Sequence, residues 1–177
     1  ASSFNENIST WDVSSVTQMD YLFCDAINFN GDISSWNVSS VNLIRYMFKD
    51  TENFNQDVTS WDVSSINNAN GMFQNAIAFN QDVSSWDISS LVYLNQIFDG
   101  TSSLSDINKC EINATFSSNG NWPYDWYNLC TVYFEENIIY SPYDGNGIRM
   151  YDIDFDGDLD FFGNNSTGGQ FFMLIND

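Results

Sequence analysis

The sequence repeats with a period of 25 residues, and this constrains the fold more than any other feature. Four copies follow one another without a gap, and each carries aromatic residues at the same places. The aligned aromatics are Phe4, Phe29, Phe54 and Phe79, then Trp11, Trp36, Trp61 and Trp86, and then Phe23, Phe48, Phe73 and Phe98. A unit this short cannot bury its own apolar face, so we expect the copies to stack around a continuous core.

Each repeat divides into two halves with different patterns. The first half, for example residues 33–38, is rich in β-branched and aromatic residues, which is typical of a strand. The second half opens with Ser39 and Ser40, and its apolar residues then recur at helical spacing. These apolar residues are Val41, Ile44, Met47 and Phe48. The pattern predicts an α/β repeat solenoid of leucine-rich-repeat type, with one short strand and one short helix per 25-residue turn.

Stacking would place equivalent polar residues above one another as ladders. Asn5, Asn30, Asn55 and Asn80 form one ladder, and we expect their side chains to hydrogen-bond along the stack. Two further ladders are acidic: Asn7, Asp32, Asp57 and Asp82, and Asp12, Asn37, Asp62 and Asp87. Stacked carboxylates repel one another unless something compensates. Backbone N–H groups of the following turn are the expected compensators, and a bound cation is the alternative.

The period degrades after residue 103, which predicts a solenoid over 1–103 and a degenerate repeat with a C-terminal cap over 104–130. After one deletion, residues 104–112 align with the repeat and place Cys110 at the tryptophan position. The aromatic residues that follow are Trp122, Tyr124, Trp126 and Tyr127. We expect them to cover the open end of the stack, because terminal repeats need a capping face. A sugar-binding cluster is the alternative.

Residues 131–177 form the third predicted part, a small β segment with a calcium loop. Asp152, Asp154, Asp156 and Asp160 stand at loop positions 1, 3, 5 and 9, and Gly157 stands at the sharp turn. Ca²⁺ prefers such an array of oxygen ligands, to which Asp158 would add its backbone carbonyl. The spacing predicts a Ca²⁺ site, with an ion-free acidic turn as the alternative. The apolar residues on either side of the loop predict strands.

Two family resemblances follow from these motifs. The repeats over about residues 1–130 resemble the BspA-like leucine-rich-repeat surface proteins, whose repeats have the form FNxDISxWDVSSVTNMxxMF. The segment IRMYDIDFDGDLDFFGNNSTGGQFFMLIND resembles the FG-GAP/VCBS calcium-binding repeat. The first resemblance implies a secreted or cell-surface protein with adhesive or structural roles and no catalytic residues. In that extracellular context, the two cysteines that flank the cap, Cys110 and Cys130, are predicted to form a disulfide, with Cys24 as a free thiol or an intermolecular partner.

Composition excludes several function classes. The chain has 24 acidic residues, four basic residues and a net charge of -20, so it would repel nucleic acid and anionic membrane surfaces. It contains no histidine, which removes Ser/His/Asp and Cys/His catalytic sites. No apolar run is long enough to predict membrane insertion.

The sequence therefore predicts an extracellular, non-catalytic protein of the cell surface. Its expected partners are other surface or matrix proteins, or further copies of the chain that assemble head to tail into a calcium-stiffened fibre. The fibre hypothesis starts from Ala1, which falls at the end of a half-repeat. Further repeats upstream, or a plainly exposed first coil, are the alternatives there. For the function itself, the alternatives are a carbohydrate-binding module and an accessory domain of a larger secreted protein.

Overall fold

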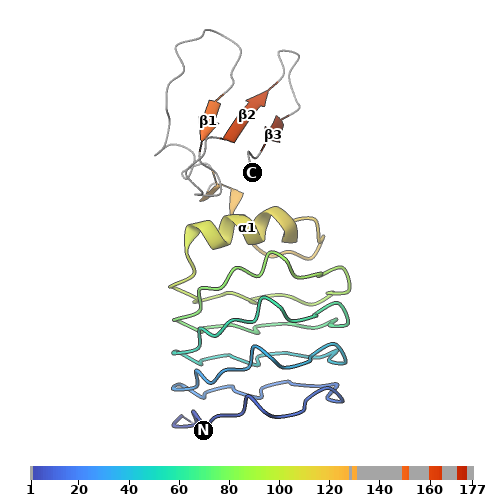
Figure 1. The fold of residues 1–177 in the computed structure, drawn as a ribbon, viewed down its shortest axis with the longest axis vertical. Coiled ribbons are helices and arrows are strands. Elements are labelled where there is room, and N and C mark those ends of the chain that lie inside the picture. Colours follow the sequence, from blue (N-terminus) through green and yellow to red (C-terminus); the bar gives the residue numbers. More distant parts are fainter. Residues whose placement is uncertain (1, 128, 131–148, 152–159, 165–170, 175–177) are drawn as a thin grey trace. The chain divides into compact units, whose positions relative to one another are not determined.

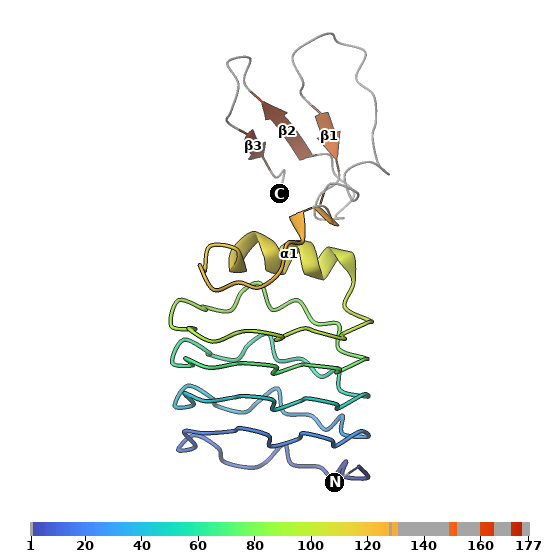
Figure 2. The same cartoon turned by 180° about the vertical axis from the view of Figure 1, so that it is seen from behind.

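The computed structural model describes residues 2–127, 129–130, 149–151, 160–164 and 171–174. The chain divides into two compact units, Ala1–Tyr127 and Asn128–Asp177. The first unit is a stack of coils followed by the helix α1 (Asp106–Phe116), as Figures 1 and 2 show from opposite sides. The second unit contains three short strands. They are β1 (Arg149–Tyr151), β2 (Asp160–Asn164) and β3 (Phe171–Leu174).

The prediction of a leucine-rich-repeat-like α/β solenoid is wrong. In place of a strand and a helix, each 25-residue coil consists of successive turns. Neighbouring coils meet at isolated parallel bridges, which join Gln18 to Leu43, Leu43 to Asn68, and Asn68 to Tyr93. The coils do stack with the 25-residue period, but their backbone has no regular secondary structure.

The first half of the repeat is not a strand because side chains fold its backbone into tight turns. Asp32 Oδ1 accepts hydrogen bonds from the backbone N–H and the hydroxyl of Ser34, at 3.0 and 2.7 Å. Asn37 binds Ser39 in the same way, at 3.2 and 2.7 Å. The Trp36 N–H also donates to the Ile33 carbonyl, three residues earlier. Such local bonds compete with extended structure.

The second half is not a helix because its N–H groups donate to the next coil. In a helix each N–H would bind the carbonyl four residues earlier. Here the N–H groups of Ile44, Tyr46 and Phe48 donate to carbonyls of the following coil, at 2.8–3.0 Å. Tyr46 also adopts a positive φ of 54°, and the equivalent positions of the other coils have positive φ as well. The apolar spacing that indicated a helix instead reflects turns that return the chain to the core every three residues.

The core consists of two ladders of phenylalanine rings, which the sequence predicted. Phe48 and Phe73 belong to one ladder and stack with centroids 5.5 Å apart. Phe54 and Phe79 belong to the other and lie 6.2 Å apart. The ladders also touch each other, since Phe73 lies 4.0 Å from Phe79. All four rings are fully buried, so the aromatic stack runs continuously through the coils.

The tryptophan ladder binds each coil to the one before it. The indole N–H of Trp36 donates to the Ile8 carbonyl at 3.2 Å, and Trp61 and Trp86 repeat this bond to Ile33 and Val58. These three rings are buried, whereas Trp11 in the first coil is 56% exposed. The ladder is therefore part of the core from the second coil onward.

Helix α1 closes the stack, and it replaces the degenerate fifth repeat that the sequence predicted. Ser105 caps its N-terminus by accepting a hydrogen bond from the Asn108 N–H. Ile112 and Phe116 on its inner face are fully buried. Cys110 accordingly lies on a helix, and the tryptophan position of a fifth coil does not exist.

The predicted aromatic cap is confirmed for three of its four residues. Trp122, Tyr124 and Trp126 are partly buried and pack against the core. All three rings lie within 6.4 Å of Phe98, the last ring of its ladder. Tyr127 is 61% exposed and does not belong to the cap.

The second unit contains a small antiparallel sheet in the order β1-β2-β3. Strands β1 and β2 pair Tyr151 with Asp160, and β2 and β3 pair Phe161 with Leu174. The flanking strands of the predicted calcium loop are thus present. Residues 152–159, which carry most of that loop, lie outside the described residues.

Candidate functional site

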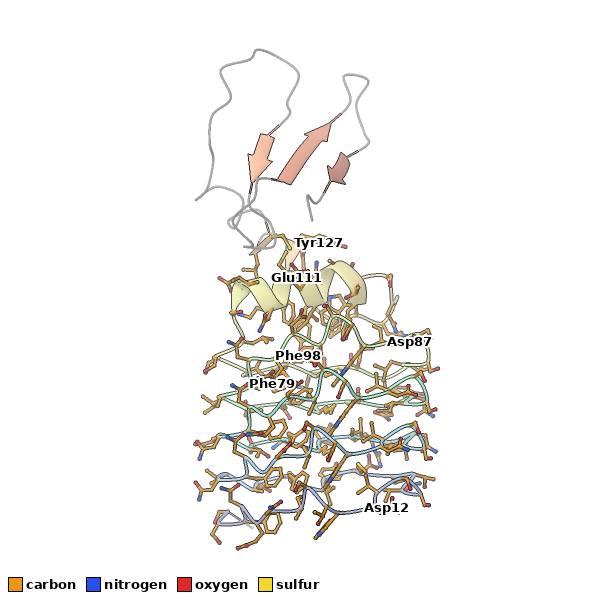
Figure 3. All side chains as sticks on the ribbon, viewed as in Figure 1. Asp12, Phe79, Asp87, Phe98, Glu111 and Tyr127 are labelled. Atoms are coloured by element: carbon orange, nitrogen blue, oxygen red, sulfur yellow. The ribbon has the colours of Figure 1, made fainter. Side chains whose placement is uncertain are left out.

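The two acidic ladders run along the stack, and each of their side chains closes a turn. Every Asp or Asn of these ladders accepts the backbone N–H of the residue two positions later. The bonds range from 2.9 to 3.2 Å and involve Asn7, Asp12, Asp32, Asn37, Asp57, Asp62, Asp82 and Asp87. Figure 3 shows Asp12 and Asp87 on the same edge. The predicted turn role of these side chains is confirmed.

The same hydrogen bonds affect the pKa values of the aspartates in these ladders. Hydrogen bonds from Ser64 lower the pKa of the Asp62 carboxyl. The bond from the Ser64 hydroxyl has the larger effect, and the bond from its backbone N–H adds to it. Asp12, Asp32, Asp57 and Asp87 have lowered pKa values for the same reason. These five aspartates therefore stay negatively charged to lower pH than free aspartates would.

The asparagine ladder is structural, and its side chains hydrogen-bond along the stack as predicted. Asn30 Oδ1 accepts the backbone N–H of Asn55 at 2.9 Å, and Asn55 Oδ1 accepts that of Asn80 at 2.8 Å. The side chain of each coil thus binds the backbone of the next coil.

A second face carries the ion pair between Asp20 and Arg45. The Arg45 guanidinium donates from Nε and Nη2 to Asp20 Oδ2, at 3.0 and 2.6 Å, and its backbone N–H donates to Oδ1 at 2.7 Å. The adjacent rings of Tyr21 and Tyr46 stack with centroids 5.1 Å apart. A methyl group at Gly71 would lie only 2.4 Å from the Tyr46 ring, so Gly71 makes room for that ring.

Polar side chains near Cys24 form a third cluster. Lys49 pairs with Asp50, and Asp50 Oδ1 also accepts a hydrogen bond from Asn75 Nδ2 at 2.7 Å. Burial, and then the charge of Asp25, raises the pKa of the Cys24 thiol. The thiol is therefore less reactive at neutral pH than an ordinary cysteine.

A groove lies between the fourth coil and the loop that follows α1. Its volume is about 580 Å³, within the range of small-ligand sites. Residues 86–92 of the coil form one side, and Thr115 and residues 118–121 form the other. Asn119 joins the two sides, because its Nδ2 donates to the carbonyls of Ile88 and Leu91 at 3.1 and 2.9 Å.

The predicted calcium ligands fall mostly outside the described residues. Asp152, Asp154, Asp156 and Asp158 lie there, and Asp160 is described only as the first residue of β2. Within the described part of the chain, no three His, Cys, Asp or Glu side chains gather closely enough to hold a metal ion. The Ca²⁺ site therefore stays a prediction.

The cysteines divide into one free thiol and two oxidised residues. Cys24 is free, whereas Cys110 and Cys130 are each disulfide-bonded. Intact-mass analysis after thiol labelling should therefore find one label under non-reducing conditions, on Cys24. Asp25→Asn should speed that labelling, because removing a nearby negative charge lowers the thiol pKa and raises the thiolate fraction. Three labels without reductant would contradict the prediction.

Comparisons with known proteins identify a family for the repeats. A family model described as "Mycoplasma protein of unknown function, DUF285" matches residues 1–114. Searches of curated proteins and of solved structures give no match. In the described part of the chain, no helix has the length and apolar character needed to cross a bilayer.

Proposed function

The chain belongs to the DUF285 family, and from that premise we propose that it is an extracellular, non-catalytic protein of the cell surface. Its stack of coils serves as a scaffold that contacts other surface or matrix proteins. The resemblance of its repeats to BspA-like surface proteins supports this location. Repeat stacks of this kind offer extended, rigid contact surfaces.

The observation that carries the proposal is how the repeats vary. Buried positions hardly change between coils, as the phenylalanine ladder from Phe23 to Phe98 shows. In contrast, the residue at the isolated parallel bridges between coils differs in every coil, and we call the face that these residues form the lateral face. Its residues are Gln18, Leu43, Asn68 and Tyr93. A face whose scaffold is constant and whose side chains differ is suited to specific contacts with another protein.

Substitutions that borrow residues from another coil can test this face without disturbing the stack. Asn68 already occupies the bridge position in the third coil, so Leu43→Asn and Tyr93→Asn should fold normally. The immobilised full chain should bind one or more matrix or cell-surface proteins saturably, and the double variant should lose that binding. Asp57→Asn, which lies on an acidic ladder and not at a bridge position, is the control. No saturable binding to a broad panel, or equal binding by the double variant, would refute the proposal.

Surface location requires its own measurement. An antibody against the repeats should label intact source cells, or detect the protein in their medium. External protease should remove the cell-bound signal without lysis. Signal that appears only after lysis would contradict an extracellular location.

We further propose that the second unit binds Ca²⁺, in keeping with its resemblance to the FG-GAP/VCBS repeat. The donor set fits a hard cation, because its ligands are carboxylate oxygens at alternating positions. The pairing of Tyr151 with Asp160 supports the proposal, since it brings together the two ends of residues 152–159. When bound, the ion would neutralise carboxylates that otherwise repel one another.

Calcium should accordingly stabilise the protein. At a free Ca²⁺ concentration 100 times the dissociation constant, we expect about 2.7 kcal/mol of added stability in the unit that binds. Asp154→Ala combined with Asp156→Ala should abolish the effect, whereas Asp57→Asn in the stack should preserve it. Calorimetry and thermal unfolding with Ca²⁺ or with a chelator measure both outcomes. Absence of Ca²⁺ binding by the wild type would refute the site.

Head-to-tail assembly is the remaining part of the proposal. In this structure Trp11 and Leu22 of the first coil are 56% and 46% exposed. A second copy that covered them would make a heterologous contact, which grows into a fibre unless it closes into a ring. Sedimentation and electron microscopy with Ca²⁺ should show polymers that Trp11→Ser disrupts. Monomers at all concentrations would exclude the fibre.

A further inference from the structure

The groove beside α1 exists because the repeat pattern stops there. In the earlier coils, the segment equivalent to residues 86–92 is covered by the coil that follows. Above the fourth coil the chain forms α1 instead, and the loop after it covers this segment only in part. Figure 3 shows Asp87 at the edge of the stack, on the side where α1 ends. The groove thus lies at the junction between the fourth coil and the loop after α1.

The groove is held open by fixed hydrogen bonds. Asn119 Nδ2 binds two carbonyls of the fourth coil, and its Oδ1 accepts the Asn121 N–H at 2.9 Å. Ser118 Oγ donates to the Thr115 carbonyl at 2.8 Å, which ties the loop to the end of α1. Both sides therefore keep their positions without a ligand, which lowers the entropic cost of binding.

The lining combines an apolar surface with polar groups. Ile88, Leu91 and Val92 line the groove; Val92 is 50% exposed, whereas Ile88 and Leu91 are buried behind it. Asp87 Oδ1 accepts the Ser89 N–H at 3.0 Å, and the Asp87 side chain is exposed. The lining residues also include the carboxamide of Asn121 and several hydroxyl groups, but no Lys or Arg.

We propose that this groove is a binding site for a neutral saccharide. A sugar ring presents an apolar C–H face that suits the aliphatic lining. Its hydroxyl groups can donate to the Asp87 carboxylate and accept from the Asn121 carboxamide. Phosphates and carboxylates are unsuited to the groove, because its only charged lining residue is an acid and the whole chain carries -20. This site is independent of the lateral face that carries the proposed protein contacts.

The repeat supplies a matched variant for the central residue. Asn37 occupies the Asp87 position in the second coil and makes the same turn with Ser39. Asp87→Asn should therefore keep the fold and lose only the charged acceptor. Asp62→Asn makes the same change one coil away from the groove and is the control. Gly120→Leu is a second variant, because a Cβ at Gly120 would meet no atom within 4 Å and its side chain can fill the groove.

The test uses isotope-labelled full chain and a panel of neutral oligosaccharides, including cellotriose, maltotriose and chitotriose. At least one sugar should shift the amide resonances of Ser89, Asn119 and Asn121. Asp87→Asn and Gly120→Leu should each lower the affinity for that sugar by about tenfold or more. The first variant loses a charged hydrogen-bond acceptor, and the second fills the groove. Asp62→Asn should bind like the wild type.

Three results would overturn the proposal. The first is that no sugar of the panel shifts the groove resonances at millimolar concentration. The second is that Asp87→Asn binds as tightly as the wild type. The third is that a cationic probe such as spermidine shifts the groove resonances while every neutral sugar fails. None of these results bears on the lateral face, so the two proposals can fail separately.

Discussion

Replacing Phe73 by alanine is expected to lower the free energy of unfolding of the coil stack by about 3–5 kcal/mol, the usual cost of emptying a buried phenylalanine site. The Phe73 ring is fully buried at the centre of the aromatic core. Its centroid lies 5.5 Å from that of Phe48 below, 5.7 Å from that of Phe98 above and 4.0 Å from that of Phe79 beside it. Its removal would leave a cavity that touches three coils, and rigid neighbouring turns cannot close it. Chemical denaturation followed by fluorescence measures the loss.

Phe4 provides the control for this prediction. It occupies the first rung of the neighbouring ladder and is only partly buried. Phe4→Ala should therefore cost much less than Phe73→Ala, because water can fill the space that it leaves. Equal losses for the two variants would show that the phenylalanine ladders do not carry the stability of the stack.

Trp61→Ala is expected to lower the free energy of unfolding by about as much as Phe73→Ala does. It removes both a large buried ring and a hydrogen bond between coils. The ring is 4% exposed, and its indole N–H donates to the Ile33 carbonyl at 3.2 Å. Trp61→Phe keeps most of the ring and removes the donor. It should cost about 0.5–1.5 kcal/mol for the lost hydrogen bond, because the Ile33 carbonyl still accepts the Trp36 backbone N–H.

Trp11→Ala is the matched control, since Trp11 occupies the same repeat position but is 56% exposed. Its substitution should change the free energy of unfolding by less than about 1 kcal/mol, as is usual for surface sites. Denaturation curves for the three variants separate ring burial from hydrogen bonding. A large loss for Trp11→Ala would contradict the explanation based on burial.

Sequence reasoning was most successful for contacts that depend on the period. The spacing of 25 residues placed Phe54 above Phe29 and Trp61 above Trp36, and the structure stacks them in that order. The Asp-x-Ser pattern also led directly to the turn closed by Asp62 and Ser64. These features follow from side-chain chemistry at fixed separations, which the sequence displays.

Sequence reasoning failed where two backbone paths place the same residues in the core. Val41, Ile44, Met47 and Phe48 are all buried, as the apolar stripe predicted. A helix would bury them on one face, and successive turns bury them as well. What distinguishes the two paths is the partner of each N–H group, and the Phe48 N–H binds Met72 of the next coil. A partner 24 residues away cannot be read from a local pattern.

The candidate groove was missed for a related reason. Its sides come from the fourth coil and from the loop after α1, and only folding brings Asp87 and Asn121 together. The sequence offered Trp122, Tyr124, Trp126 and Tyr127 as a sugar site only as the alternative to a cap, and the first three rings pack against the core. A signal was present in the loss of the period after residue 103, because a groove can open where the next coil is missing.

The sequence by itself thus determined the period, the stacking of the coils, the rings that fill the core and the turns that the acidic ladders close. Each of these depends on residue type and spacing alone. Only the tertiary structure decided that the coils are built from turns, that α1 replaces a fifth coil, and that a groove opens beside it. Those outcomes depend on hydrogen bonds between neighbouring coils and on which surface the end of the stack must cover, and neither exists until the chain has folded.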